Sequence, residues 1–313
     1  MGRIRTVVLM GGTSAEREVS LRSGQMAIDA LNPDTYDAAA LDTGQPDWIA
    51  QLLSGPRPDV AVIILHGPGG EDGVVQGLLQ SLGIPFTGSG VMSSALCMDK
   101  ELTKLVLRSE GIPVPQSFTL TAGDWDRTGM LELVQDLPLP MVIKPNRQGS
   151  TRGASKVTRR EEVLPAIAEG LKYDTSVLLE EFVTGMEITA CVLGGNDLEV
   201  LPLIEIVPQS GFYDYHDKYT PGATDEIIPA RIPQRRAEEA RKYALQAHRR
   251  LKCWGMSRTD MIVGETETRV LEVNTIPGLT ATSLLPLAAS AAGISMADLL
   301  GRLIDLARQR PEG

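Results

Sequence analysis

The stretch RTVVLMGGTSAEREVSL, residues 5–21, predicts the fold class of the first part of the chain. The run Arg5–Met10 ends in four consecutive apolar residues, which is typical of a strand buried in a parallel sheet. Two glycines and a polar loop follow, and a helical pattern then covers Ser20–Leu31. Strand, glycine-rich loop and helix form the unit of α/β proteins, in which ligands bind at the carboxyl ends of the strands.

The same unit recurs further along the chain. DVAVIIL (59–65) is a second continuous apolar run, HGPGGEDG (66–73) is its glycine-rich loop, and a helical pattern covers Val74–Leu82. We therefore expect an N-terminal parallel-sheet domain that closes near residue 90. The opening residues MGRIRTVVLMGG carry only a short apolar run before Gly-Gly, so we interpret them as the first strand and not as a signal peptide.

The rest of the chain shows a different, α+β order. A helix is expected over Met92–Glu110, because Gly111 and Pro113 follow it. We expect a small middle block and then a strand-rich part whose strands are antiparallel. The expected strands are PMVIKPN (140–146), SVLLEEFVTG (176–185), MEITACVLGG (186–195), LEVLPLIEIV (198–207), SRTDMIVGE (257–265) and TRVLEVN (268–274), and the expected helices cover Glu161–Leu171, Gln234–Lys252 and Ile294–Arg310.

Composition limits the classes of function. The 313 residues suffice for two or three domains, and the net charge of -10 excludes bulk electrostatic attraction to nucleic acid or to an anionic membrane. No apolar run is long enough to span a bilayer. Cys97, Cys191 and Cys253 lie far apart in sequence, so we expect neither a disulfide framework nor a zinc site, but three small buried residues in a reducing cytosol.

A cation site is one interpretation of the stretch LEVNTIPG (271–278). Glu272 and Asn274 point to the same face of a strand, because side chains alternate along it. Asp260 lies on the strand before the hairpin, and Arg258 shares its face. If the two strands pair, Asp260, Glu272 and Asn274 converge, and three oxygen donors suit Mg²⁺. The alternative at this point is a solvated strand edge.

Placed lysines indicate a site for nucleotide phosphates. Lys144 lies inside an apolar strand, where a lysine is costly unless paired, and Lys100 opens a helix after a glycine- and serine-rich stretch. The alternative is a surface lysine whose alkyl chain covers the protein. Neither G-x-x-x-x-G-K-[ST] nor G-x-G-x-x-G occurs in the chain. Glu180, Glu181 and Glu187 are either partners of a nucleotide's sugar and amine or solvated charges.

The loops at the N-terminal end carry further polar groups. Glu16 lies in the loop after the first strand, and His66 and Glu71 occupy the equivalent loop of the second unit. The glycines around His66 allow close approach of the backbone to a ligand, although a lone His is usually structural. The aromatic, polar segment FYDYHDKYTPGATDE (212–226) has the length of a lid over a site.

Taken together, these stretches resemble the D-alanine–D-alanine ligases, which are ATP-grasp carboxylate–amine ligases. The resemblance runs from residue 4 to about residue 305, and its motifs occur in the family's order. They are GGTSAEREVSL (11–21), LHGPGGEDG (65–73), FTGSG (86–90), MDK (98–100), IKPNRQGS (143–150), GFYDYHDKY (211–219), SRTD (257–260) and LEVNTIPGLTATSLLP (271–286).

The resemblance implies a three-domain ATP-grasp architecture of α/β and α+β parts. An N-terminal parallel-sheet, substrate-binding domain (1–90) is followed by a central ATP-grasp subdomain (91–184) and a C-terminal ATP-grasp and catalytic domain (185–313), and the last two clamp ATP. It also implies an ADP-forming, Mg²⁺-dependent ligation of two D-alanine molecules for peptidoglycan precursors, and thus for cell wall biogenesis and cell shape. The expected setting is a cytoplasmic homodimer without nucleic acid or membrane partners.

Individual residues receive roles by the same resemblance. Two Mg²⁺ ions, with Mn²⁺ as the alternative metal, would be held by Asp260, Glu272 and Asn274, and ATP by Lys100, Lys144, Glu180, Glu181, Val183, Glu187 and Lys218. Catalysis would involve Arg258 and the N–H of Gly278 as an oxyanion hole, and Glu16, Ser150 and Tyr219 as a trio that closes over the substrates. The substrates would be bound by Glu16, His66, Lys218, Ser283 and Leu284.

Three alternatives compete with this interpretation. The first is an ATP-grasp ligase that joins other amino or hydroxy acids. In the family, a tyrosine at the position of Tyr219 is typical of enzymes with an amine nucleophile, so Tyr219 favours a dipeptide product. The second is a dinucleotide-dependent oxidoreductase, which lacks the third-glycine spacing and leaves the oxygen donors around Asp260 unexplained. The third is a non-catalytic nucleotide-binding module, which would not need Arg258, Ser150 and Tyr219 together.

Overall fold

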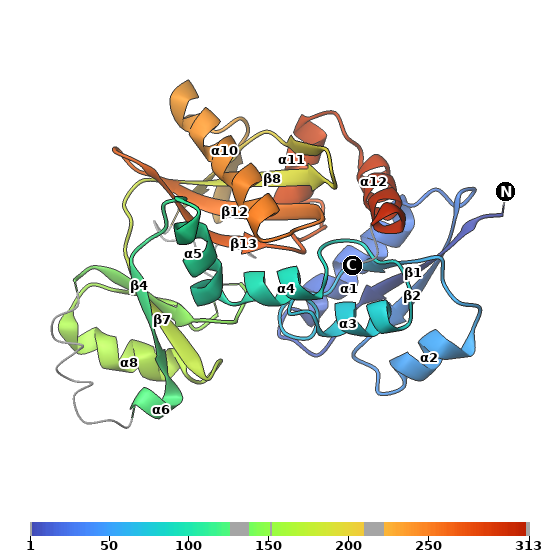
Figure 1. The fold of residues 1–313 in the computed structure, drawn as a ribbon, viewed down its shortest axis with the longest axis horizontal. Coiled ribbons are helices and arrows are strands. Elements are labelled where there is room, and N and C mark those ends of the chain that lie inside the picture. The colour runs from blue at the N-terminus through green and yellow to red at the C-terminus, as the bar shows by residue number, and fades with distance from the viewer. Residues whose placement is uncertain (1, 126–137, 151, 210–221, 311–313) are drawn as a thin grey trace.

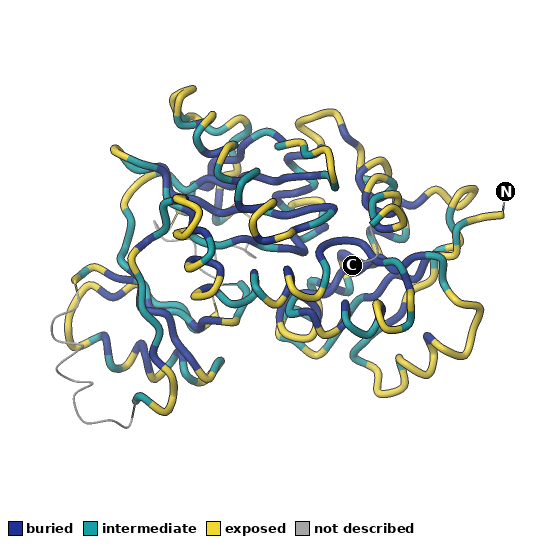
Figure 2. The backbone as a smooth tube through the Cα atoms, viewed as in Figure 1, coloured by how far each residue is buried: buried dark blue, intermediate teal, exposed yellow. Residues whose placement is uncertain are grey.

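The structure, a computed structural model, describes residues 2–125, 138–150, 152–209 and 222–310. The described residues form three sheets that follow one another along the long axis of the molecule. Figure 1 shows the N-terminal sheet (blue) at one end, a second sheet (green) at the other end, and the C-terminal sheet (orange) between them. Buried backbone follows the strands of all three sheets (Figure 2).

The first sheet is parallel and has the strand order β2-β1-β3, which confirms the predicted α/β unit. Helix α1 begins at Arg17, three residues before the predicted start. Arg17 and Glu18 are charged, so the apolar pattern that predicts the helix does not include them. Arg17 instead forms an ion pair of 2.6 Å with Asp42 at the end of β2. The elements are β1 (Ile4–Met10), α1 (Arg17–Ala30), β2 (Tyr36–Asp42), α2 (Trp48–Ser54), β3 (Val60–Ile63) and α3 (Val74–Ser81).

The second sheet is antiparallel, in the order β4-β7-β5-β6, and α8 packs on one of its faces. Strand β5 is the predicted strand around Lys144, and its alternate residues Met141 and Ile143 are buried in the core beneath α8. The elements are β4 (Ser117–Thr121), α6 (Ala122–Trp125), β5 (Met141–Pro145), β6 (Ser155–Val157), α8 (Arg160–Gly170) and β7 (Ser176–Glu181).

The third sheet is six-stranded and antiparallel, in the order β11-β10-β8-β12-β13, with β9 beside β8. The single strand predicted over residues 198–207 is two strands, because Pro202 cannot donate a ladder hydrogen bond. Helix α10 covers this sheet (Figure 1). The elements are β8 (Met186–Gly194), β9 (Leu198–Val200), β10 (Ile204–Pro208), β11 (Thr224–Ile227), α10 (Gln234–Arg250), β12 (Gly255–Val263) and β13 (Thr268–Asn274).

The helix predicted over Met92–Glu110 is wrong, because two helices, α4 (Val91–Met98) and α5 (Lys100–Ser109), take its place. Asp99 between them has extended backbone, and its carboxylate accepts a hydrogen bond of 3.0 Å from the N–H of Leu102. A capping aspartate starts a new helix at this point. The break allows α5 to pack on β13, which places its buried lysines beside the third sheet.

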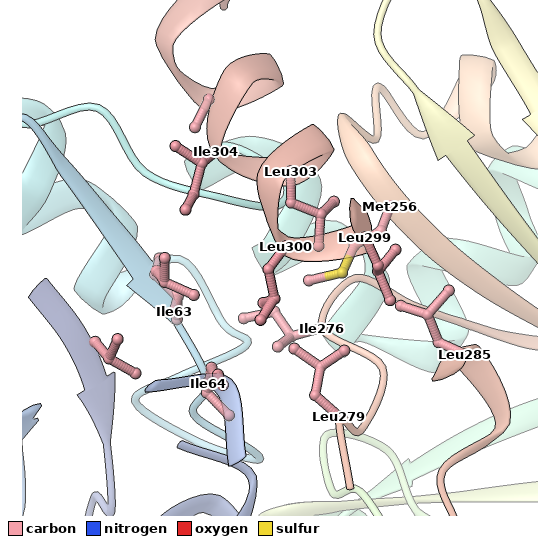
Figure 3. Close-up of a cluster of buried hydrophobic side chains, with 14 of the residues drawn as sticks. Ile63, Ile64, Met256, Ile276, Leu279, Leu285, Leu299, Leu300, Leu303 and Ile304 are labelled. Carbon is pink, nitrogen blue, oxygen red and sulfur yellow. The ribbon is translucent and has the colours of Figure 1, made fainter. Parts of the chain in front are cut away.

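The helices at the end of the chain return to its beginning. Helices α11 (Leu284–Ala291) and α12 (Met296–Gln309) share one apolar core with the first sheet. Figure 3 shows Leu300 and Ile304 of α12 beside Ile63 at the end of β3. Each predicted domain range therefore contains one sheet, whereas α12 contacts β3 and α1 of the first range, and α11 contacts α12 and β8.

No single helix among the described residues is both long and apolar enough to cross a bilayer. Helices α11 and α12 reach that length and composition only together, and they are bent by 105° at the break between them.

Candidate active site

Strands β12 and β13 pair as the cation interpretation requires. Asp260 lies opposite Glu272, and Arg258 lies opposite Asn274. The carboxylate of Asp260 receives hydrogen bonds from Arg258 (2.8 and 2.9 Å), from the amide of Asn274 (3.2 Å) and from Thr189 Oγ1 (2.6 Å). The predicted convergence of these strand residues is therefore confirmed.

The donor set fits a divalent cation only if other ligands complete it. Among the described residues, no group of three or more His, Cys, Asp or Glu side chains could hold an ion by itself. Asp260, Glu272 and Asn274 supply two carboxylates and one carboxamide, which are hard oxygen donors of the kind that Mg²⁺ prefers. Mg²⁺ usually takes its remaining ligands from water and substrate phosphates, so an incomplete protein shell is what such a site presents.

A cluster of buried lysines lies next to this strand pair. Lys144 Nζ lies 3.0 Å from Glu180 Oε1, and Lys104 Nζ lies 2.6 Å from Glu180 Oε2. Lys104 also donates to the carbonyl of Leu271 at 2.8 Å, and its side chain is 1% exposed. Lys100 Nζ donates to the carbonyl of Gln148 at 2.6 Å. Lys104 and Lys144 thus share the carboxylate of Glu180, whereas Lys100 Nζ lies 3.7 Å from Glu272 Oε2.

The two partners of Glu180 differ in their protonation behaviour. Burial lowers the pKa of Lys104 to about 8, against the opposing pull of Glu180. Burial also disfavours the charge of Lys144, but the carboxylates of Glu180 and Glu272 outweigh it, and the pKa of Lys144 is raised. Lys144 thus remains a cation at neutral pH and lines the adjoining cavity.

A cavity of about 600 Å³ opens between the second and third sheets. Every described residue predicted to bind ATP lines this cavity, together with Ser150, Asp260 and Glu272. A smaller cavity of about 20 Å³ shares Lys100, Gln148 and Glu272 with it. The residues predicted for ATP that line the larger cavity are Lys100, Lys144, Glu180, Glu181, Val183 and Glu187.

Glu180 and Glu181 have protein partners in addition to their place on the cavity wall. Glu180 is 3% exposed and is neutralised by Lys104 and Lys144. Glu181 accepts a hydrogen bond of 2.8 Å from the N–H of Gln116 and pairs with Arg269. Both carboxylates therefore stabilise the wall itself, and their contact with ATP stays a prediction.

Glu16, His66 and Glu71 meet at the carboxyl end of the first sheet. A methyl group added to Gly149 would lie 3.0 Å from Glu16 Oε2, and one added to Gly67 would lie 3.3 Å from it, so the two loops close around this carboxylate. Glu71 Oε2 accepts a hydrogen bond of 2.7 Å from the N–H of Gly67.

The charges in this cluster are unequal. Burial, and secondarily the neighbouring Glu16, raise the pKa of Glu71 to about 8, so Glu71 is protonated at neutral pH. Burial lowers the pKa of His66, which is therefore neutral. Contact of Glu16 with an ammonium group of the substrate stays a prediction.

Ser150 and Tyr219 belong to the trio predicted to close over the substrates. Ser150 has φ of +54°, a left-handed conformation that is uncommon outside glycine and that clusters at functional sites. Tyr219 and Lys218 lie outside the described residues. The trio can therefore be placed only for Glu16 and Ser150, which reach the same region from β1 and from the loop after β5.

Gly278, Ser283 and Leu284 lie together on the turn that leads from β13 into α11. A methyl group on Gly278 would lie 2.7 Å from Ser283 Oγ, so only glycine fits there without displacing the serine. Ser283 Oγ lies 3.1 Å from the N–H of Thr280 and 2.7 Å from its hydroxyl. Helix α11 begins at Leu284, and the N–H groups of its first turn form a natural partner for a carboxylate.

Two family models match the chain. One is described as D-ala D-ala ligase C-terminus and matches residues 106–305, and the other as D-ala D-ala ligase N-terminus and matches residues 51–89. The chain belongs to the D-alanine–D-alanine ligase family. The D-alanine–D-alanine ligases of Desulforudis audaxviator and Desulforamulus reducens are 49% and 46% identical to it, and each alignment covers 98% of this chain and 99% of the relative.

Solved structures of the family share the fold. The D-alanine–D-alanine ligase of Bacillus anthracis complexed with ATP has a TM-score of 0.84 at 34% identity, and the alignment covers 97% of both chains. The VanG D-Ala:D-Ser ligase of Enterococcus faecalis has a TM-score of 0.84 at 32% identity and covers 98% of this chain and all of its own. Ligases that share this fold thus differ in their second substrate, which is D-alanine for the first of these two and D-serine for the other.

Sequence reasoning missed two polar residues of the site. Lys104 follows Lys100 by four residues on α5, so both lie on one helix face, and that spacing was a usable signal. Glu71 was noted in its loop without a role, and its protonation depends on burial that no local pattern reveals.

Proposed function

We propose that this chain joins two D-alanine molecules into D-alanyl-D-alanine, with ATP converted to ADP and phosphate, for peptidoglycan precursor synthesis. The observation that carries the proposal is one continuous lining: the carboxylates of Asp260 and Glu272 border the same cavity as Lys100 and Lys144. Phosphate-binding cations and metal ligands are thereby adjacent, as phosphoryl transfer requires.

In the first step, the carboxylate of one D-alanine attacks the γ-phosphorus of ATP and forms an acyl phosphate. Lys100 and Lys144 border the cavity and offset negative charge on the phosphates. Glu16 receives the ammonium group of this D-alanine and so orients its carboxylate. Asp260, Glu272 and Asn274 would hold two Mg²⁺ ions, or Mn²⁺ in their place, whose chemistry is to neutralise phosphate oxygens.

In the second step, the amine of the other D-alanine attacks the acyl carbon, and phosphate leaves. Arg258 and the N–H of Gly278 would stabilise the oxyanion of the tetrahedral intermediate. Ser283 and Leu284 would hold the carboxylate of this second molecule at the start of α11. Arg258 is oriented by its two hydrogen bonds to Asp260, which joins the oxyanion group to the metal ligands.

Water must be excluded, because the acyl phosphate would otherwise hydrolyse. Segment 212–226 has the composition of a lid and carries Tyr219 and Lys218. Of this segment, β11 belongs to the described residues and extends the third sheet beside β10. We propose that Tyr219 meets Glu16 and Ser150 when the lid closes, and that Lys218 contacts ATP and substrate.

Three further expectations stand as proposals. The ranges 1–90, 91–184 and 185–313 are proposed as the domains, with α12 packed against the first of them. A homodimer is proposed from the family resemblance alone. A cytoplasmic setting is proposed because the nucleotide and the reduced cysteines suit it.

The direct test is ADP release. The full-length protein with ATP, Mg²⁺ and D-alanine is expected to release one ADP per D-alanyl-D-alanine, identified by chiral chromatography and mass. L-alanine should give no product, and D-serine or D-lactate offered as the second substrate should compete poorly. ADP release that does not depend on D-alanine would contradict the proposal. A preference for D-serine or D-lactate would assign the chain to a different ligase specificity.

A further inference from the structure

Two cysteines that lie 156 residues apart meet in the folded chain. Cys97 Sγ and Cys253 Sγ are 3.9 Å apart, and each residue is 6% exposed. The hydroxyl of Ser93 donates to Cys253 Sγ at 3.5 Å. The expectation of three small buried cysteines is confirmed, and the fold adds that two of them are neighbours, because α4 meets the segment before β12.

The pair lies beside the proposed active site. Cys97 lies in the last turn of α4, three residues before Lys100, and lines the small cavity that also has Glu272 and Asn274 in its wall. Cys253 lies between α10 and β12, five residues before Arg258. A bond between the two sulfurs would thus join the segment that carries Lys100 to the strand that carries Arg258.

The two thiols are not equivalent. The hydrogen bond between the two sulfurs lowers the pKa of Cys253, and Ser93 adds to this effect, although burial opposes it. The same hydrogen bond raises the pKa of Cys97. Cys253 is therefore the sulfur that deprotonates first, and thiolates are the reactive form of cysteine.

We propose that Cys97 and Cys253 form an oxidisable dithiol, a modification site at which a hydroperoxide closes a disulfide between α4 and the segment before β12. Hydrogen peroxide is small enough to approach the sulfur pair from the cavity that Cys97 lines, and Cys253 Sγ lies 3.9 Å from Cys97 Sγ. The third cysteine, Cys191, lies on β8 and serves as an internal comparison.

The chemistry balances with one equivalent of hydrogen peroxide. The Cys253 thiolate attacks one peroxide oxygen, the O–O bond breaks, and hydroxide leaves and takes up the proton that the thiol had released. This step oxidises Cys253 to a sulfenic acid. Cys97 then attacks that sulfur, the S–S bond forms, and the hydroxyl leaves as water with the Cys97 proton. Two thiols and one peroxide thus yield one disulfide and two waters.

Closure must bring the two sulfurs together and thereby ties the segments that carry them. The separation has to fall from 3.9 Å to about 2.05 Å, the length of a disulfide bond. The end of α4 leads through Asp99 into Lys100, so the constraint acts on the phosphate side of the site. We therefore expect oxidation to lower ligation. This consequence rests on the proposed function, whereas formation of the disulfide does not.

The first experiment asks whether the bond forms in the folded chain. Reduced full-length protein is treated with hydrogen peroxide, denatured, alkylated and mapped by peptide mass without reduction. The expected result is one disulfide that joins the Cys97 and Cys253 peptides, with Cys191 alkylated. The Cys191→Ala variant is the matched control, because it removes the third buried thiol and should form the same bond. Three alkylated thiols, or a disulfide to Cys191, would overturn the proposal.

The second experiment follows activity on the same samples. Turnover should fall on the order of tenfold or more on oxidation, since small displacements near reacting groups have effects of that size, and should return with dithiothreitol. Cys97→Ala and Cys253→Ala should each be active, and peroxide should not lower their turnover. Both variants retain all eleven methionines, so a loss of turnover caused by methionine oxidation would occur in them as well. A disulfide that leaves turnover unchanged overturns the link to the active site. An inactive reduced protein would contradict the proposed function and leave the disulfide result intact.

Discussion

Asp260 on β12 lies directly opposite Glu272 on β13, and the amide of Asn274 donates to Asp260 Oδ2 at 3.2 Å. The pairing register decides this arrangement, because a slip by one residue would turn the side chains of one strand to the other face of the sheet. The same register places Arg258 opposite Asn274. One strand pair therefore brings the proposed metal ligands and the proposed oxyanion group together.

The metal assignment predicts that Glu272→Gln lowers turnover by roughly a hundredfold or more while the fold persists, because the amide is a weaker ligand of the same size. Turnover is measured as ADP release over a range of Mg²⁺ concentrations. Asp260→Asn should have the same effect with some loss of stability, since Asp260 is buried and paired with Arg258. Glu267→Gln on the same hairpin is the control and should be near normal. Normal turnover of Glu272→Gln at low Mg²⁺ would refute the assignment.

Lys104 is predicted to stabilise the protein and not merely to line its interior. Lys104→Met removes one of the two cations on buried Glu180 and leaves the carbonyl of Leu271 without its donor. Breaking a buried pair in this way costs about 3–5 kcal/mol, which should appear as a lower thermal midpoint. The exposed pair of Lys172 with Glu169 provides the control, and Lys172→Met should leave the thermal midpoint nearly unchanged. Equal midpoints for the two variants would show that the buried cluster is not stabilising.

Tyr219 lies outside the described residues, and its lid role is tested through coupling. Tyr219→Phe should bind ATP nearly normally, because the ring is kept, but should close less firmly over the acyl phosphate. We expect more phosphate released per dipeptide formed than in the unmodified protein. The two products are counted in the same reaction. An unchanged ratio would argue against contact of the Tyr219 hydroxyl with the closed site.

His248 predicts an acid-sensitive component of stability. Burial lowers its pKa from 6.5 to about 4, and its Nδ1 lies 2.8 Å from Ser257 Oγ. The unfolded chain therefore takes up this proton first, so the contribution is complete above pH 6.5 and is lost as pH falls from 6.5 to 4, by roughly 3 kcal/mol.

His248→Asn should accordingly lose less stability than the unmodified protein between pH 6.5 and 4. Thermal midpoints of both proteins over this range measure the difference, and carboxylates that titrate in both proteins cancel. Parallel pH profiles would show that His248 is not neutral in the folded state.

Local patterns were sufficient for the elements that build the site. Glycine-rich loops after apolar strands indicated the parallel sheet, and alternation along residues 257–274 indicated the strand pair around Asp260. The helix break at Asp99 was missed because the apolar pattern continues across it, although Asp before Lys100 is a capping signal. The capping preference of Asp99 competes with the helix propensity of its neighbours. Packing of α5 on β13 favours two helices over one continuous helix.

Contacts between distant segments could not be predicted in the same way. The Cys97–Cys253 pair, the Glu180 cluster with Lys104, and the return of α12 to β3 all depend on how the three sheets are assembled. Nothing in the local sequence around any of these residues encodes its partner. Protonation of Glu71 follows from that assembly as well, because it requires burial next to Glu16.

The central claim, ligation through an acyl phosphate, is tested most directly by following oxygen atoms. D-alanine labelled with ¹⁸O in its carboxylate is incubated with the protein, ATP and Mg²⁺, and the released phosphate is analysed by mass spectrometry. Attack of the carboxylate on the γ-phosphorus predicts one ¹⁸O in phosphate for each D-alanyl-D-alanine formed. Dipeptide accompanied by unlabelled phosphate, or labelled water in place of labelled phosphate, would contradict the account.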